Sequence, residues 1–189
     1  MIKDLTVSKG NSKLPDSTTI FNLPCFITCP GKTKECMVDC YARKAEIQYH
    51  KTVLPCRMRN LESTKKASFA TGLVIAIQKT KNKTFRYFES GDFYSQGLID
   101  KSIKVANILP DVFFYAYTKS LHLFNFSNIP GNFRVIDSLN HKNSKHKAVV
   151  IRDNESIPKG FFVCPGSCKK CNYCFNQKTK KVMVAFPLH

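Results

Sequence analysis

The chain has 189 residues, of which 43% are hydrophobic and 12% aromatic, and its formal net charge is +17 at pH 7. This length and apolar content suit one packed domain over residues 1–189, and the apolar runs are far too short to cross a bilayer. The first ten residues carry no apolar run, so we expect no secretory signal, no membrane partner and a cytoplasmic protein.

The first part of the chain is predicted to pass from an extended segment into a helix. Residues 1–24 carry Gly, Pro and Ser turn signals and are expected to be extended. A cysteine-rich loop follows at 24–42. Gly and Pro are absent from 35–51, which predicts a helix there, and on such a helix Cys36 and Cys40 would share one face.

The rest of the chain alternates between predicted helices and strands. Pro55 is expected to end the first helix, and further helices are expected over 57–79 and 95–108, with a short helix or turn at 121–126. Strands are expected over 84–89, 112–117, 132–136, 148–152, 160–163 and 181–186. This alternation predicts an α/β fold with a small parallel or mixed sheet, or an incomplete barrel, and cysteine-rich metal-binding loops at both chain ends (24–42 and 163–175).

Polar side chains follow two of the predicted strands. Glu89 and Asp92 come after one strand, and Lys119 follows the next. Chemistry in parallel α/β sheets sits at the carboxyl ends of strands, so Asp92, Lys119 and Glu89 are candidate cofactor-binding residues, and Lys119 and Arg86 are candidates to hold an anion. Two plainer interpretations stay open: loops are polar because they are wet, and Asp92 could cap the following helix.

Eight of the nine cysteines fall into two sets, one near each end of the chain. The N-terminal set is Cys25, Cys29, Cys36 and Cys40; the C-terminal set is Cys164, Cys168, Cys171 and Cys174, spaced C-x3-C-x2-C-x2-C within eleven residues. In a reducing compartment such tight clusters indicate metal ligation rather than disulfides, and Cys56 is left as a buried or free thiol. All eight clustered cysteines are therefore candidate metal ligands.

The compact C-terminal run favours iron and sulfide over zinc. Structural zinc usually joins two separated ligand pairs, whereas four-cysteine runs of this kind are typical of iron–sulfur proteins. We expect one or two 4Fe–4S clusters, with zinc as the alternative, and a C-terminal run that faces Cys29, Cys36 and Cys40 with ligand sharing left open. The expected role is electron transfer, or the redox centre of an enzyme, with an unidentified redox partner or small molecule.

Two alternative functions remain. The first three C-terminal cysteines have the C-x3-C-x2-C spacing of radical SAM enzymes, but Cys174 offers a fourth thiolate where that chemistry needs an open iron. The high positive charge is typical of proteins that bind nucleic acid, which allows a zinc-stabilised nucleic-acid-binding protein. Lysines on an ordinary solvated face would explain the same charge.

Several of these motifs together resemble the phage "gene product 88" family of small viral and bacterial proteins. The motifs are Thr28-Cys29-Pro30-Gly31, Cys36-x3-Cys40-Tyr41-Ala42, Ser90-Gly91-Asp92-Phe93, Tyr115-Ala116-Tyr117-Thr118-Lys119-Ser120, Cys168-x2-Cys171-x2-Cys174 and Phe186-x2-His189. The resemblance covers roughly residues 20–189 and implies a phage or prophage origin, hence a host-cell location, and cysteine-bound iron–sulfur. The resemblance does not indicate a chemical reaction for the protein. Cys25, and Lys119 in place of Arg, depart from the family pattern.

Overall fold

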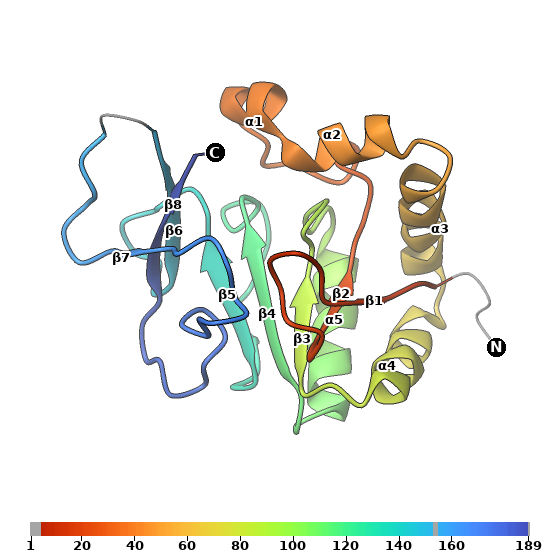
Figure 1. Cartoon of the computed structure of the whole chain (residues 1–189). Coiled ribbons are helices and arrows are strands. Elements are labelled where there is room, and N and C mark those ends of the chain that lie inside the picture. Colours follow the sequence, from red (N-terminus) through yellow and green to blue (C-terminus); the bar gives the residue numbers. More distant parts are fainter. Residues whose placement is uncertain (1–4, 153–154, 189) are drawn as a thin grey trace.

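The computed structural model describes residues 5–152 and 155–188 and shows an α/β architecture built on one open sheet (Figure 1). Its eight strands lie in the order β1-β2-β3-β4-β5-β6-β8-β7. They are β1 (Ser8–Lys9), β2 (Thr18–Phe21), β3 (Thr84–Tyr87), β4 (Phe113–Thr118), β5 (Phe133–Asp137), β6 (Lys147–Ile151), β7 (Phe162–Val163) and β8 (Met183–Pro187).

The sheet is mixed and does not close. β1 is antiparallel to β2, whereas every other neighbouring pair is parallel. From β1 to β6 the spatial order follows the chain, so the sheet winds in one direction. Among the described residues β1 pairs only with β2, and β7 only with β8, so both edges stay open.

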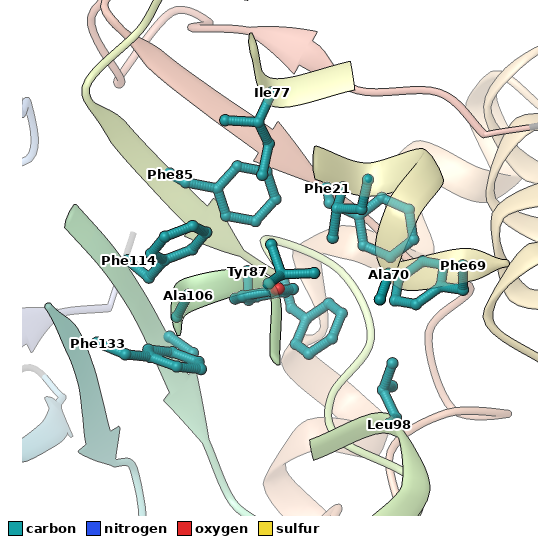
Figure 2. Packing of buried hydrophobic residues seen from close by; sticks show 14 of the residues in the cluster. Phe21, Phe69, Ala70, Ile77, Phe85, Tyr87, Leu98, Ala106, Phe114 and Phe133 are labelled. Carbon is teal, nitrogen blue, oxygen red and sulfur yellow. The ribbon is translucent and has the colours of Figure 1, made fainter. Parts of the chain in front are cut away.

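Helices cover one face of this sheet and build the main core on it. The described residues form five helices: α1 (Lys34–Asp39), α2 (Tyr41–Gln48), α3 (Val53–Lys65), α4 (Phe69–Thr80) and α5 (Gln96–Ile108). Residues of α3, α4 and α5 pack against aromatic side chains from neighbouring strands, among them Phe85, Tyr87, Phe114 and Phe133 (Figure 2). Alternate strand residues face these helices, which leaves the intervening residues for the other face.

The C-terminal segment covers that other face. Arg86, Tyr115 and Arg134 lie side by side on it, because β3, β4 and β5 pair in that register. Arg134 fixes the segment: its guanidinium donates hydrogen bonds to the carbonyl oxygens of Cys174, Asn176 and Thr179 at 2.8–3.1 Å. The position of the C-terminal cysteine loop is therefore set by the middle of the sheet.

The expected helix over 35–51 is wrong in one respect, because the chain breaks at Cys40. Cys40 has extended backbone angles between α1 and α2, so Cys36 and Cys40 do not share one continuous helix face. The break lets α2 bury Ala42 and Glu46, while α1 has no buried residue. The burial of these α2 residues therefore outweighs the local propensity of residues 35–51 to form one continuous helix.

The expected helix over 57–79 is also two helices. α3 ends at Lys65 and α4 begins at Phe69, and Pro55 stands in the first turn of α3 instead of ending the previous helix. Proline is tolerated in a first turn because the first N–H groups of a helix have no acceptor within it. The helix expected at 95–108 and the six expected strands are confirmed to within two residues at each end.

No helix in the described part of the chain is long and apolar enough to cross a membrane. His189, named above as the end of a motif, lies outside the described residues.

Replacing a buried core aromatic should strongly destabilise the fold. Phe85 is fully buried, with its ring centroid 4.8 Å from that of Tyr87 and 5.3 Å from that of Phe114. We expect Phe85→Ala to lower the free energy of unfolding by about 3–5 kcal/mol, measured by denaturant unfolding. Ile75→Ala, on the exposed face of α4, is the matched control and should change it far less; equal losses would contradict this core.

Candidate functional site

The four C-terminal cysteines line one cavity on the sheet face opposite the helices. The cavity measures about 50 Å³. Its walls are Cys164, Cys168, Cys171 and Cys174 together with Pro165, Ser167, Arg86 and a shell of Tyr115, Tyr117, Phe162, Tyr173, Phe175, Val184 and Phe186. A cavity of this size holds several water-sized groups, so it is roomier than a single ion requires.

Burial and neighbouring charge set the protonation of these thiols. Burial raises the pKa of Cys174 to about 11; a hydrogen bond from Tyr117 lowers it, and the charges of Cys168, Cys164 and Cys171 raise it. Burial likewise raises the pKa of Cys168, which the positive charge of Arg86 opposes. The pKa values of Cys168 and Cys174 are thus raised by the neighbouring cysteines, and the pocket supplies one cation, Arg86, and one hydroxyl donor, Tyr117, that oppose this effect.

Two polar atoms in this pocket are buried without a hydrogen-bond partner in the described structure. They are Nε of Arg86 and the hydroxyl of Tyr115. Neither residue follows from the cysteine spacing. Arg86, a candidate to hold an anion, lies within β3 and lines the cysteine pocket.

No group of three or more His, Cys, Asp or Glu side chains in the described residues is arranged to hold a metal ion. The nine cysteines are all described and none forms a disulfide.

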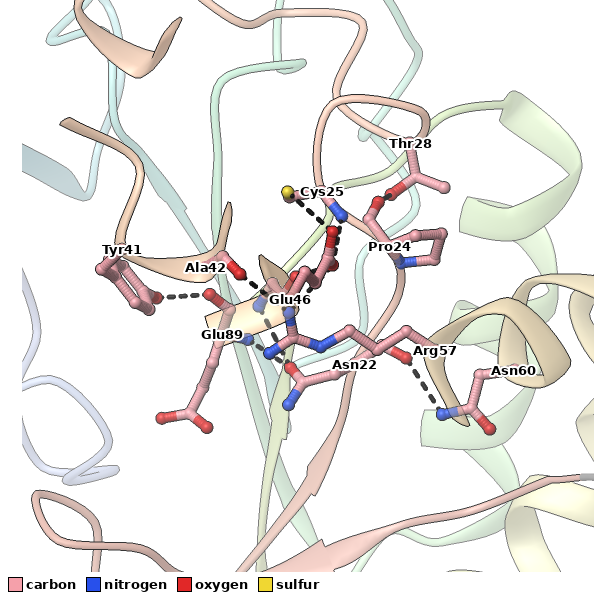
Figure 3. Close-up of polar contacts among 11 residues, drawn as sticks. Asn22, Pro24, Cys25, Thr28, Tyr41, Ala42, Glu46, Arg57, Asn60 and Glu89 are labelled. Carbon is pink, nitrogen blue, oxygen red and sulfur yellow. Dashed lines mark hydrogen bonds and ion pairs between the residues drawn. The ribbon is translucent and has the colours of Figure 1, made fainter. Parts of the chain in front are cut away.

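The N-terminal cysteines do not line this cavity, and Cys25 is hydrogen-bonded to a buried carboxylate (Figure 3). Cys25 is 4% exposed; its N–H and its thiol donate to the Glu46 carboxylate at 2.9 and 3.0 Å. Glu46 also accepts from Arg57 at 2.9 Å and from Ser90 at 3.3 Å. Burial, followed by the Glu46 carboxylate, raises the pKa of Cys25 far above its ordinary value. As placed here, Cys25 holds its proton and serves as a structural donor.

Cys36 contacts a strand-end lysine. Nζ of Lys119 lies 2.8 Å from Sγ of Cys36. Burial raises the pKa of Cys36, but the hydrogen bonds from Lys119 and Thr33 lower it more, so its net pKa is below the ordinary value. The backbones at Gly31 and Lys119 also lie close together, since a Cβ on Gly31 would lie 2.1 Å from the Lys119 carbonyl oxygen. This contact joins the N-terminal cysteine loop to the carboxyl end of β4.

Asp92 organises the same strand end instead of capping α5, whose N-cap is Ser95. Its carboxylate accepts from the Thr118 hydroxyl at 2.6 Å, the Lys119 N–H at 2.9 Å and the Ser120 hydroxyl at 3.0 Å. Burial nevertheless raises the pKa of Asp92. Burial, followed by the charge of Asp92, raises the pKa of nearby Cys29 to about 12.

Glu89 does not join Asp92 and Lys119. Its carboxylate accepts from the Asn11 amide at 2.7 Å and lies 3.7 Å from Arg86, while its carbonyl oxygen accepts from the Tyr41 hydroxyl. Glu89 and Arg86 thus stand between the two cysteine sets. Among the described residues no hydrogen bond joins a cysteine of one set to a cysteine of the other, and ligand sharing between the two chain ends stays a prediction.

The chain belongs to the gene product 88 family, whose model matches residues 3–158. No curated protein and no solved structure matches the chain. The matched segment includes the N-terminal cysteines, Asp92 and Lys119, and it stops before Cys164. The evidence for the C-terminal pocket therefore comes from the structure of this chain and not from the family match.

Breaking the hydrogen-bond network of Glu46, which joins Cys25, Arg57 and Ser90, should destabilise the protein. Glu46→Gln leaves the Arg57 guanidinium without its anion at a site where the two side chains are 10% and 11% exposed. We expect a loss of about 3 kcal/mol in the free energy of unfolding. The control is Glu62→Gln, which breaks an exposed ion pair with Lys65 and should leave that free energy unchanged. Equal effects of the two variants would show that the contacts of Glu46 do not stabilise the fold.

Removing Lys119 should slow the chemical reactivity of Cys36. In metal-free protein at pH 7.5, Lys119→Ala raises the Cys36 pKa and lowers its thiolate fraction, so iodoacetamide should label Cys36 several-fold more slowly. Peptide mass spectrometry measures the rate at each cysteine. Lys101→Ala, remote from the cysteines, is the control, and an unchanged Cys36 rate in Lys119→Ala would contradict the ion pair.

Proposed function

We propose that this member of the gene product 88 family binds a 4Fe–4S cluster in the C-terminal cysteine pocket and serves in oxidation–reduction, as an electron carrier or as the redox centre of an enzyme. The observation that carries the proposal is that all four cysteines of the run line one cavity. When bound, the cluster would supply one-electron transfer.

The shape of the pocket supports a cluster over a single ion. Zinc requires four sulfur atoms about 2.3 Å from one point. The four cysteines of the run line one cavity of about 50 Å³. A four-iron cube spreads its ligands over a larger body than a single ion does, so four cysteines around one cavity suit it. A fourth cysteine in the same wall also argues against the open iron of radical SAM enzymes.

The charges of the pocket support the same group. Four thiolates around a core of charge +2 carry a net charge of about −2, which is costly to bury without compensation. Arg86 lies in the wall, and Tyr117 donates a hydrogen bond to Cys174. Metal binding would displace the protons that burial favours on Cys168 and Cys174.

The surrounding residues can exclude water without isolating the site. The Tyr117 and Phe186 rings pack at 5.6 Å, and the Phe162 and Tyr173 rings at 4.7 Å. Phe162 is 41% exposed, so the rim of the pocket reaches the surface. A redox partner could approach there.

We assign one cluster rather than two. The Cys25 thiol donates a hydrogen bond to Glu46, and the Cys36 sulfur accepts one from Lys119, so the N-terminal set does not offer four equivalent thiols. We also propose a reducing, cytoplasmic location, since all nine cysteines are unpaired.

Metal and sulfide analysis of anaerobically purified protein tests this function. We expect a brown protein with about four iron and four acid-labile sulfide per chain. Cys174→Ala should lose iron or hold it less stably, because Cys174 closes the fourth position. Cys25→Ala and Cys56→Ala should keep full iron and sulfide.

Two results would contradict the proposal. One is stoichiometric zinc without sulfide in iron-replete, anaerobically prepared protein. The other is equal iron loss in Cys56→Ala and Cys174→Ala, which would separate iron binding from this pocket.

A further inference from the structure

The floor of the cysteine pocket carries two hydrogen-bond donors that nothing in the described structure satisfies. Nε of Arg86 and the hydroxyl of Tyr115 are buried and unpartnered, and both residues line the cavity. Tyr115 is 1% exposed, and the Arg86 side chain is 17% exposed. Native proteins rarely bury a donor without an acceptor, so an unpaired donor beside a cavity points to an acceptor in that cavity.

Packing holds both donors in place. Arg86 on β3 pairs in register with Tyr115 on β4. The guanidinium carbon of Arg86 lies 5.9 Å from the Tyr115 ring centroid and 5.3 Å from that of Tyr117. The Tyr115 ring stacks on Phe175 at 5.3 Å. These rings leave Arg86 and Tyr115 little freedom to turn toward water or another partner.

The four cysteines that line the same cavity offer sulfur atoms as acceptors for these donors. Cys168 and Cys174 influence the ionisation of Tyr115, and Arg86 influences that of Cys168, so these groups lie within electrostatic reach of one another. The nearest carboxylate partner of Arg86 is Glu89, at 3.7 Å from its terminal NH1, which leaves Nε unused. Tyr117, two residues after Tyr115 on β4, already donates its hydroxyl hydrogen bond to Cys174.

We infer that Arg86 and Tyr115 donate hydrogen bonds to the sulfur atoms of the cluster and raise its reduction potential; the inference rests on the proposed function. Reduction adds one electron and hence one negative charge to the group in the pocket. Donors and a cation stabilise the more negative form more than the oxidised form, and hydrogen bonds to sulfur are a recognised control of cluster potential. Arg86 and Tyr115 are thus positioning residues that tune the centre without ligating it.

The test measures the reduction potential of the holoprotein by redox titration with electron paramagnetic resonance. Tyr115→Phe removes only the hydroxyl, and Arg86→Gln removes the cation and the Nε donor. Tyr87→Phe is the control: its hydroxyl is also buried, but it belongs to the core on the helix-covered face. Iron and sulfide are counted in every variant before titration.

We expect Tyr115→Phe to shift the reduction equilibrium about tenfold toward the oxidised form, which is ~59 mV for one electron, and Arg86→Gln to shift it further. Tyr87→Phe should leave the potential unchanged. If Tyr115→Phe and Arg86→Gln retain four iron with unaltered potential, the inference is wrong while the proposed function stands. Wild-type protein without iron and sulfide would overturn both.

Discussion

The alternation of side chains along β3 and β4 is the constraint on which the rest of this structure depends. Phe85, Tyr87 and Phe114 face the helices and build the core. Arg86 and Tyr115 come between them in the sequence, so they must face the other side of the sheet. A slip of one residue would bury the cation in the aromatic core and remove it from the cysteines, so the register that stabilises the fold also builds the pocket.

Buried charge is handled differently at the two cysteine sets. At the N-terminal set, Glu46 finds every partner within the protein: a guanidinium, a hydroxyl, a thiol and a backbone N–H. At the C-terminal pocket, Arg86 lines the cavity with the four cysteines and pairs with the Glu89 carboxylate at 3.7 Å, and one of its donors stays unpaired. A satisfied network stabilises a fold, whereas an unsatisfied one beside a cavity indicates a missing ligand. This contrast separates a structural cysteine from candidate ligands of the same residue type.

Sequence periodicity predicted the strands and α5 well, because each is a short apolar or amphipathic run bounded by turn residues. It also placed Asp92 and Lys119 at one sheet edge, where they do meet. It failed at Cys40, since nothing local shows that burial of Glu46 would turn the chain there. It could not place Arg86 under the cysteine loop, because a sheet covered on both faces shows no polar face in its pattern.

The central claim is that the C-terminal cysteines hold iron and sulfide. X-ray absorption at the iron edge of anaerobically purified protein tests it most directly, because it reports the atoms around the metal. The account predicts iron surrounded by sulfur with further iron in the second shell, and loss of that iron–iron signal in Cys174→Ala. An iron-free protein with zinc bound to four isolated sulfur ligands would contradict it.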